Sequence, residues 1–168
     1  MITNEQIVDV LKSWDKKPRD IRIADDGFVD CRIPNLIDPE KPHLLVIDPV
    51  AEANILRICI PSLVRIPRPG LFLHKGVCCV NDLLSLGRVG LTTRNGLNFT
   101  LEHVCRDGDE VDPSPQVLKQ MLDCIVTELP EVEKILLQCI MIDSGMSRTR
   151  SDQVMNALFP EDELDGDE

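Results

Sequence analysis

Two pairs of cysteine and histidine are the residues in this sequence best suited to chemistry. His74 and Cys78 are four positions apart, which places both on one face if that segment is helical. Cys105 follows His103 by two positions, which places both on one face of a strand. A histidine within hydrogen-bond reach can activate a thiol as a nucleophile, so one hypothesis is a small thiol-dependent enzyme or redox sensor using Cys78 or Cys105. The simpler interpretation is that these cysteines pack as small hydrophobic residues.

The cysteines as a set indicate free thiols in a reducing compartment. Their number is odd, and none lies in a CxxC or Cys/His metal spacing. The adjacent Cys78 and Cys79 could hardly pair with each other without strain. We therefore expect a cytoplasmic protein. The seven cysteines are Cys31, Cys59, Cys78, Cys79, Cys105, Cys124 and Cys139.

Metal, phosphate and nucleic-acid sites have little support in the sequence. The stretch 107–112 (DGDEVD) resembles a calcium loop only faintly, because its glycine is second instead of sixth and Leu118 stands where the closing glutamate belongs. Gly87, Gly90 and Gly96 do not form a phosphate-binding loop. The net charge is −11, and phosphate binding requires clustered Lys and Arg. We expect no cofactor, no metal and no nucleic-acid partner.

The length of 168 residues suits one domain with a short tail. We expect a domain over 1–143, a helical extension over 144–159 and an acidic, disordered tail over 160–168 (PEDELDGDE). No apolar run is long enough to span a bilayer, and the first residues lack the pattern of a signal peptide. We therefore expect no membrane association.

The first third of the chain predicts a helix and then a hairpin. Thr3 and Gln6 have the spacing of a capping box. The apolar residues after them recur every three or four positions as far as Trp14, as in an amphipathic helix. Alternating apolar residues over 21–23 and 29–33, separated by a turn signal, predict two antiparallel strands.

The middle of the chain predicts two further strands and a second helix. Strands over 43–48 and 53–60 would be joined by a short turn around Pro49. The prolines of 61–70 argue against regular structure throughout that stretch. Residues 71–84 fit either a helix or a short strand, and we predict the helix because its apolar residues have helical spacing.

The second hairpin has the clearest local signal, an Asn95-Gly96 turn within 86–105. A two-residue turn would set Leu91 opposite Thr100. A type I turn with Gly96 as a left-handed bulge would set Leu91 opposite Phe99. The second register gathers apolar residues on one face, so we predict it, and it requires a positive φ at Gly96.

The C-terminal part predicts a long helix. Ser114 caps it, with Pro115 in the first position, and its apolar face continues as far as about Asp143. Pro130 should end or kink this helix. Ser151 could begin a short last helix.

The predicted fold class is α+β, with an antiparallel sheet packed against helices in the order helix, three strands, helix, two strands, helix. The segments that carry a resemblance to a known family are 55–67 (ILRICIPSLVRIP), Asn81, 87–104 (GRVGLTTRNGLNFTLEHV) and 113–126 (PSPQVLKQMLDCIV). With the order of elements and the acidic composition, they resemble the YbjN-type domain of the type III secretion chaperone-like superfamily over roughly residues 3–140. The proline-rich stretch 61–70 and the break at Pro130 depart from that pattern.

The resemblance implies binding rather than catalysis. Secretion-chaperone-like proteins are small, acidic and usually dimeric, and they hold an extended client segment against apolar patches. The resemblance brings no catalytic residue to this chain. We therefore expect a non-enzymatic protein-binding module, chaperone-like or regulatory, that acts on a protein client and forms a homodimer.

Candidate contact residues come from the long C-terminal helix. Its adjacent apolar pairs allow one face to cover the sheet while another meets a partner, and methionine suits adaptable surfaces. The alternative is that these residues are core. The predicted contact residues are Val117, Met121, Ile125, Leu136 and Ile140.

Overall fold

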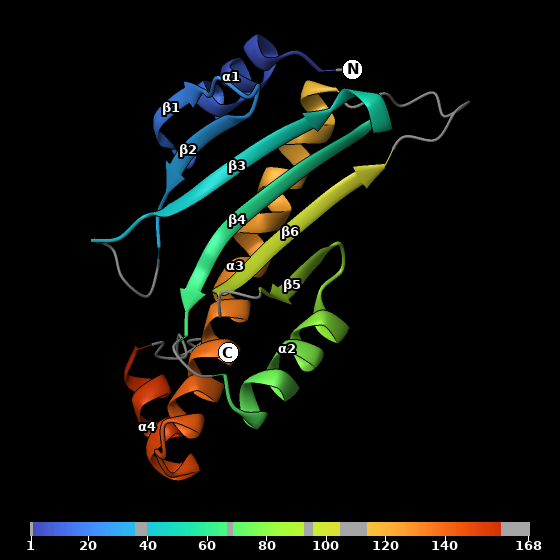
Figure 1. The fold of residues 1–168 in the computed structure, drawn as a ribbon. Helices are drawn as coiled ribbons and strands as arrows, with labels where there is room; N and C mark the ends of the chain where they lie inside the picture. The colour runs from blue at the N-terminus through green and yellow to red at the C-terminus, as the bar shows by residue number, and fades with distance from the viewer. Residues whose placement is uncertain (1, 36–39, 67–68, 93–95, 105–113, 159–168) are drawn as a thin grey trace, which may run out of the picture.

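The computed structural model describes residues 2–35, 40–66, 69–92, 96–104 and 114–158 (Figure 1). These ranges form one antiparallel sheet and four α-helices, which confirms the predicted α+β class. The helices are α1 (Asn4–Ser13), α2 (Leu71–Leu83), α3 (Pro115–Asp143) and α4 (Arg148–Leu158). The strands are β1 (Arg19–Ile23), β2 (Val29–Ile33), β3 (His43–Val50), β4 (Ile55–Arg65), β5 (Gly87–Leu91) and β6 (Gly96–Val104), in the sheet order β1-β2-β3-β4-β6-β5. Four strands therefore separate α1 from α2.

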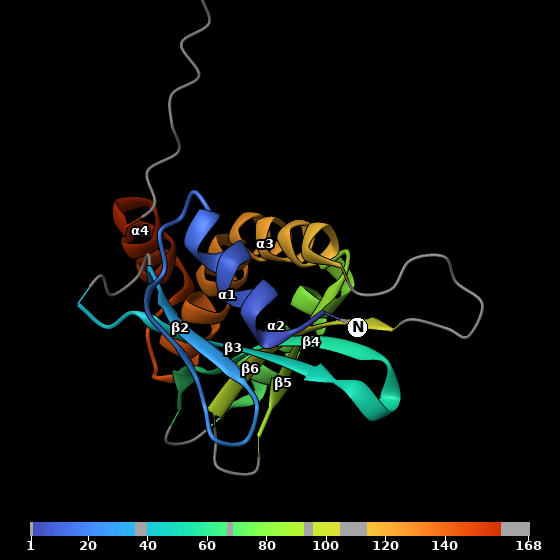
Figure 2. The same cartoon turned by 90° about the horizontal axis from the view of Figure 1, so that it is seen from above.

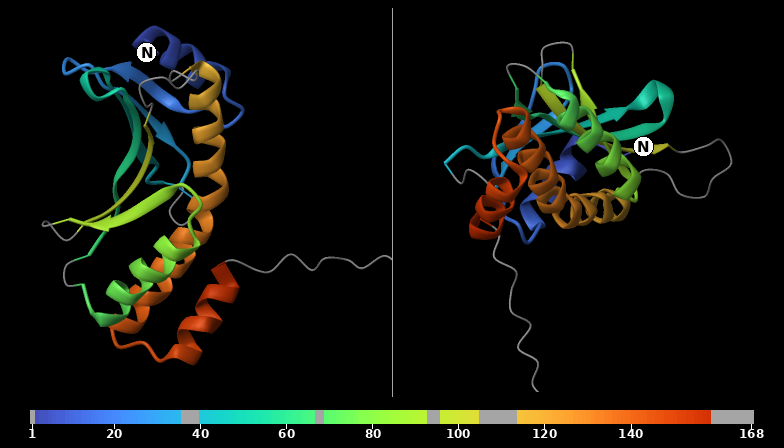
Figure 3. Two further views of the ribbon diagram at one scale, coloured as in Figure 1. Left: turned by 90° about the vertical axis from the view of Figure 1, so that its right-hand side faces the viewer. Right: turned by 90° about the horizontal axis from the view of Figure 1, so that it is seen from below.

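The molecule has two layers. Helices α1, α2 and α3 lie on one face of the sheet, and α4 packs against α3 (Figure 2). Figure 3 shows that the sheet bows toward the helices, so its other face is concave. None of the described helices covers that concave face.

Local signals in the first third of the chain are confirmed. The Thr3 hydroxyl accepts from the Gln6 backbone N–H at 3.3 Å, and the Gln6 side chain accepts from the Thr3 N–H at 2.9 Å. These two bonds satisfy free N–H groups at the start of α1. In the β1–β2 turn, Gly27 has a φ of +86°, a conformation that favours glycine.

Prolines interrupt the middle strands less than predicted. Pro49 lies within β3 and pairs with Leu56, so the turn falls at Ala51–Ala53. Strand β4 continues through Pro61 to Arg65. The β4–β6 register shifts between Ile60 and Val64, and a proline at such an irregularity need not donate a ladder hydrogen bond.

Residues 71–83 form a helix, as predicted, and the C-terminal end of α3 fixes its start. The Asp143 carboxylate accepts from the backbone N–H groups of Phe72 and Leu73, at 3.1 and 2.9 Å. Gly70 makes room for this carboxylate, since an added Cβ would lie 2.2 Å from it. Gly76 similarly lets α2 approach Cys139 of α3 closely.

The predicted register of the second hairpin is wrong by two residues. Leu91 pairs with Leu97, and Val89 pairs with Phe99. Gly96 does not have a positive φ; its carbonyl instead accepts from the Thr92 N–H at 2.8 Å. The ring of Phe99 lies over Gly87, where an added Cβ would be 2.4 Å from Cζ. Only a glycine fits under that ring, so packing selects the observed register.

Helix α3 is capped as predicted but passes through Pro130 without ending. Val117 donates to the Ser114 hydroxyl at 3.3 Å, and the helix ends at Asp143. Because Pro130 lacks an N–H, the i+4 bond to the Val126 carbonyl is missing. The last helix begins before the predicted Ser151, which is buried inside it.

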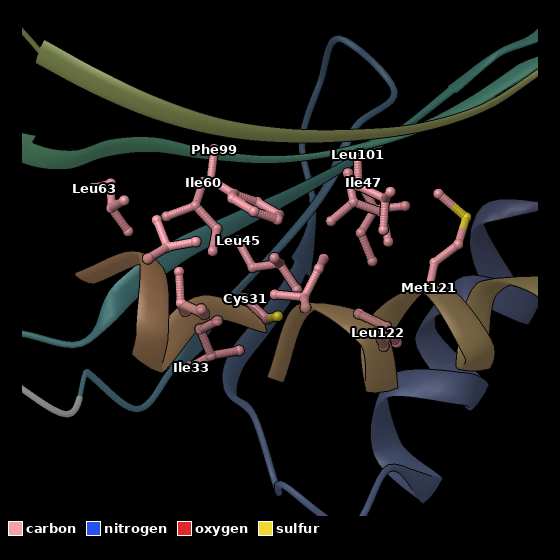
Figure 4. Packing of buried hydrophobic residues seen from close by; sticks show 14 of the residues in the cluster. Cys31, Ile33, Leu45, Ile47, Ile60, Leu63, Phe99, Leu101, Met121 and Leu122 are labelled. Carbon is pink, nitrogen blue, oxygen red and sulfur yellow. The ribbon is translucent and has the colours of Figure 1, made fainter. Parts of the chain in front are cut away.

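The core lies between the sheet and the helices. Figure 4 shows side chains of the strands directed toward α3, with Met121 and Leu122 directed back toward the sheet. Most of these side chains are Leu, Ile and Val. Within the described ranges, no helix combines the length and apolarity needed to cross a bilayer.

Candidate protein-binding surface

The contact residues predicted on α3 lie mostly in the core. Met121, Ile125 and Leu136 are buried, and Val117 and Ile140 are half-buried against the same core. In this folded state, Met121, Ile125 and Leu136 offer a partner almost no surface. These three residues therefore lie in the core, as the alternative interpretation of the sequence has it.

The two residues of the first cysteine–histidine pair are not hydrogen-bonded to each other in the structure. His74 and Cys78 are both exposed on α2, and the described hydrogen bonds include none between them. His103 lies near the end of β6, and Cys105 is outside the described residues.

The thiols whose pKa values shift are all weakened as nucleophiles. Burial raises the pKa of Cys31 to about 12. Burial is also the largest cause of the raised pKa values of Cys59, Cys124 and Cys139. A raised pKa lowers the thiolate fraction at neutral pH, so these positions suit packing. Among the described residues, no group of His, Cys, Asp or Glu could hold a metal ion.

One buried polar pair was not predicted from the sequence. His43 Nε2, at the start of β3, contacts Glu133 Oε1 of α3, and both side chains are buried. The second oxygen, Glu133 Oε2, has no hydrogen-bond partner in the structure. Glu133 lies four positions after Leu129 and three before Leu136, so its place on the buried stripe was the available signal. This pair joins the sheet to α3.

The concave face carries a row of paired charges. Arg57 Nε lies 2.6 Å from Glu102 Oε1, and Arg57 Nη1 lies 3.6 Å from Asp48 Oδ2. The hydrogen bond to Glu102 is the main cause of the raised pKa of Arg57. Burial raises the pKa of Asp48, while Arg57 opposes that shift. Arg57 is therefore already occupied by two carboxylates.

Beside this row lies a hollow of about 330 Å³ at the β5–β6 side of the concave face. Leu86 and Val104 line it and are 64% and 54% exposed. Arg88 also lines it and is exposed, and it forms no ion pair with any described residue. Thr100 and Glu102 complete the lining. The hollow thus combines exposed apolar side chains with an available cation.

Both edges of the sheet have features that disfavour the addition of another strand. On β5, the Asn81 amide donates to the Val89 carbonyl at 3.0 Å and accepts from the Val89 N–H at 2.7 Å. The Asn81 side chain thereby replaces a neighbouring strand at that point. On β1 the register is irregular between Arg19 and Arg22, and Asp20 has a φ of +53°. Irregular, charged edges resist pairing with another chain.

A second set of exposed apolar side chains lies on α2, where Leu83 lines a shallow hollow together with residues of α3. Phe72 and Leu83 are 48% and 70% exposed, and Cys79 is exposed between them. Their spacing of seven and four residues places all three on one stripe of the helix. We call Phe72, Cys79 and Leu83 the α2 stripe.

The hollow could have been found in the sequence by alternation. Leu86, Arg88 and Val104 occupy positions that alternate with the buried Val89 and Leu101, which places them on the opposite face. Neither a protein-family model, nor a curated protein, nor a solved structure matches this chain.

Proposed function

We propose that this protein is a non-enzymatic protein-binding module of the secretion-chaperone-like kind, which holds an extended client segment against the concave face of its sheet. The observation that carries the proposal is the hollow beside Leu86 and Val104, two large apolar side chains that are more than half exposed. Exposed apolar groups that gather in a hollow mark interaction sites more often than scattered ones do.

The chemistry of the hollow favours a particular kind of segment. An extended peptide presents alternate side chains to the surface on which it lies. Apolar side chains would rest on Leu86 and Val104, and an acidic side chain would meet Arg88. Arg57 is already bound by Glu102 and Asp48, which leaves Arg88 as the cation available there. Asn81 occupies the β5 edge, so contact through the face is favoured over strand addition.

The cysteines support a cytoplasmic location for this activity. All six described cysteines are free. Free thiols persist in reducing compartments, whereas disulfides form and persist in oxidising ones.

Binding can be tested with a displayed library of random ten-residue peptides, selected on the full-length protein and measured by fluorescence anisotropy. We expect selected peptides to alternate apolar residues and to contain an acidic residue. The substitution Val104→Glu should weaken their binding at least tenfold, or about 1.4 kcal/mol, because it places a carboxylate in the apolar part of the hollow.

The matched control is Lys119→Glu, which introduces the same carboxylate at an exposed position on α3. Binding should be unchanged in this variant, and Arg88→Glu should weaken peptides that contain an acidic residue. Equal binding by wild type and Val104→Glu would place the site elsewhere. A library that yields no binders above background would also contradict the proposal.

We propose that the α2 stripe joins two copies of the chain into a homodimer. Phe72 and Leu83 are two of the large apolar side chains that are exposed among the described residues, and a two-fold axis would set one stripe against the other. Sedimentation velocity at micromolar concentration should show a dimer for wild type and a monomer for Leu83→Glu. The control Leu71→Glu changes an equally exposed leucine of the same helix that lies off the stripe, and it should stay dimeric. A monomeric wild type, or a dimeric Leu83→Glu variant, would exclude this interface.

A further inference from the structure

A separate apolar cavity of about 250 Å³ lies on the helix side of the sheet, between the end of α1, the end of β2 and the middle of α3. Trp14 lines it from α1, Ile33 and Pro34 from β2, and Leu129 and Pro130 from α3. An apolar cavity of about 150 Å³ is large enough for benzene. This cavity therefore has room for a larger apolar body, of roughly ten carbons by proportion.

Two features keep the cavity open. The Trp14 indole is fixed in place, because its Nε1 donates to Asp123 Oδ1 at 3.0 Å. Helix α3 changes direction near the middle of its length, in the region of Pro130 (Figure 3). A proline inside a helix lacks the bond to the carbonyl four residues earlier, and it bends the helix. Val126, which carries that carbonyl, lines the cavity together with Pro130.

Among the described residues, Lys16 is the one charged side chain that lines the cavity. Lys16 lies in the turn after α1, and the Lys17 N–H closes that turn on the Trp14 carbonyl at 3.0 Å. The nearby carboxylate of Asp123 is bound to the Trp14 indole and is not part of the lining. Ligand sites characteristically combine apolar walls with a few polar groups that fix orientation. An ammonium group beside apolar walls complements a ligand with one negative charge.

We propose that this cavity binds a small free monocarboxylic acid, with its carboxylate beside the Lys16 ammonium and its apolar body against Trp14, Leu129 and Pro130. The site shares no residue with the concave face or with the α2 stripe. Its test is therefore independent of the proposed client binding.

Octanoate, octanol and octylammonium are suitable probes, because they share one apolar chain and differ in charge. Affinity for the full-length protein would be measured by calorimetry. Trp14 is the only tryptophan in the chain, so its fluorescence reports on the cavity directly. We expect octanoate to bind about fivefold more tightly than octanol, as for an exposed ion pair, and octylammonium to bind most weakly.

Three variants locate the site. Lys16→Gln should lower octanoate affinity to that of octanol, and the neighbouring Lys17→Gln, which does not line the cavity, should leave it unchanged. Val126→Phe should fill the cavity and abolish binding of both probes, with circular dichroism confirming that the variant is folded. In the wild type, 8-bromooctanoate should quench Trp14 fluorescence more than octanoate does, because bromine quenches on contact.

Several outcomes would overturn the proposal. If octanol bound as tightly as octanoate, or if Lys16→Gln left the octanoate affinity unchanged, the Lys16 ammonium would not contribute to binding. Absence of extra quenching by the brominated acid would place any bound acid outside this cavity. A peptide that competes with octanoate while free acids alone bind only at millimolar concentration would assign the cavity to a side chain of a client instead.

Discussion

Replacement of Glu133 by alanine is expected to lower the free energy of unfolding by about 3–5 kcal/mol, because it leaves a buried histidine without its partner. Both His43 and Glu133 are buried, and their contact joins β3 to α3. Removing one member of a buried polar pair exposes the other to the full cost of desolvation. Urea denaturation followed by circular dichroism would measure the difference.

Two further variants separate the loss of the His43–Glu133 contact from the loss of side-chain volume. Glu131→Ala removes an exposed glutamate two positions away and should change the stability by less than about 0.5 kcal/mol. The double substitution His43→Leu with Glu133→Met replaces the pair with apolar side chains of similar size. It should recover most of the loss, since buried pairs often exchange for apolar residues without net cost. A double variant as unstable as Glu133→Ala would show that packing, and not the unpaired polar group, sets the cost.

Most elements of the fold could be predicted because their signals are local. The caps formed by Thr3 and Ser114 require only residues three positions away, and both are present in the structure. The helix over 71–83 follows from apolar spacing alone. Such signals act through neighbouring backbone groups, so no knowledge of the rest of the chain is needed.

The hairpin register could not be predicted, because contacts across the strands decide it. The Asn95-Gly96 signal suggested a short turn, but the fit of Phe99 over Gly87 selects a register shifted by two residues. A shift of two leaves every side chain on its predicted face, so the assignment of buried positions survives. The shift does change the neighbours, and these determine the function of the concave face.

Arg88 illustrates this consequence. The predicted register would set Arg88 opposite Glu102, where the two could form an ion pair. In the observed register Arg88 faces Thr100, and Glu102 instead binds Arg57 of β4. The cation of the hollow is therefore available because of a packing contact between Gly87 and Phe99.

Burial of the contact residues predicted on α3 also depends on contacts between elements that are distant in the sequence. The sequence shows that α3 is apolar on a broad face, but it does not show how much of that face the sheet covers. The six-stranded sheet is wide enough to bury Met121, Ile125 and Leu136 together. Most of the large apolar side chains that are exposed in the described residues lie instead on α2 and beside β5.

Replacing Phe99 by alanine should lower the free energy of unfolding by about 3–5 kcal/mol, because it empties a fully buried aromatic site on β6, next to the edge strand β5. Gly87→Ala should cost about 1–3 kcal/mol, because its new methyl group would meet the Phe99 ring. Thermal and urea unfolding of both variants would give these values.

The two substitutions should be strongly non-additive, because they act on one contact. Once Phe99 is alanine, the space above Gly87 is free, so adding Gly87→Ala should cost little or restore part of the stability. The control Gly90→Ala makes the same change in the same strand at a position where an added Cβ meets nothing within 4 Å, and its effect should be small. If Gly87→Ala cost the same with and without the Phe99 ring, the ring would not lie over Gly87. The physical reason given for the observed register would then be wrong. The explanation of why Arg88 forms no ion pair with another described residue of the concave face would be wrong as well.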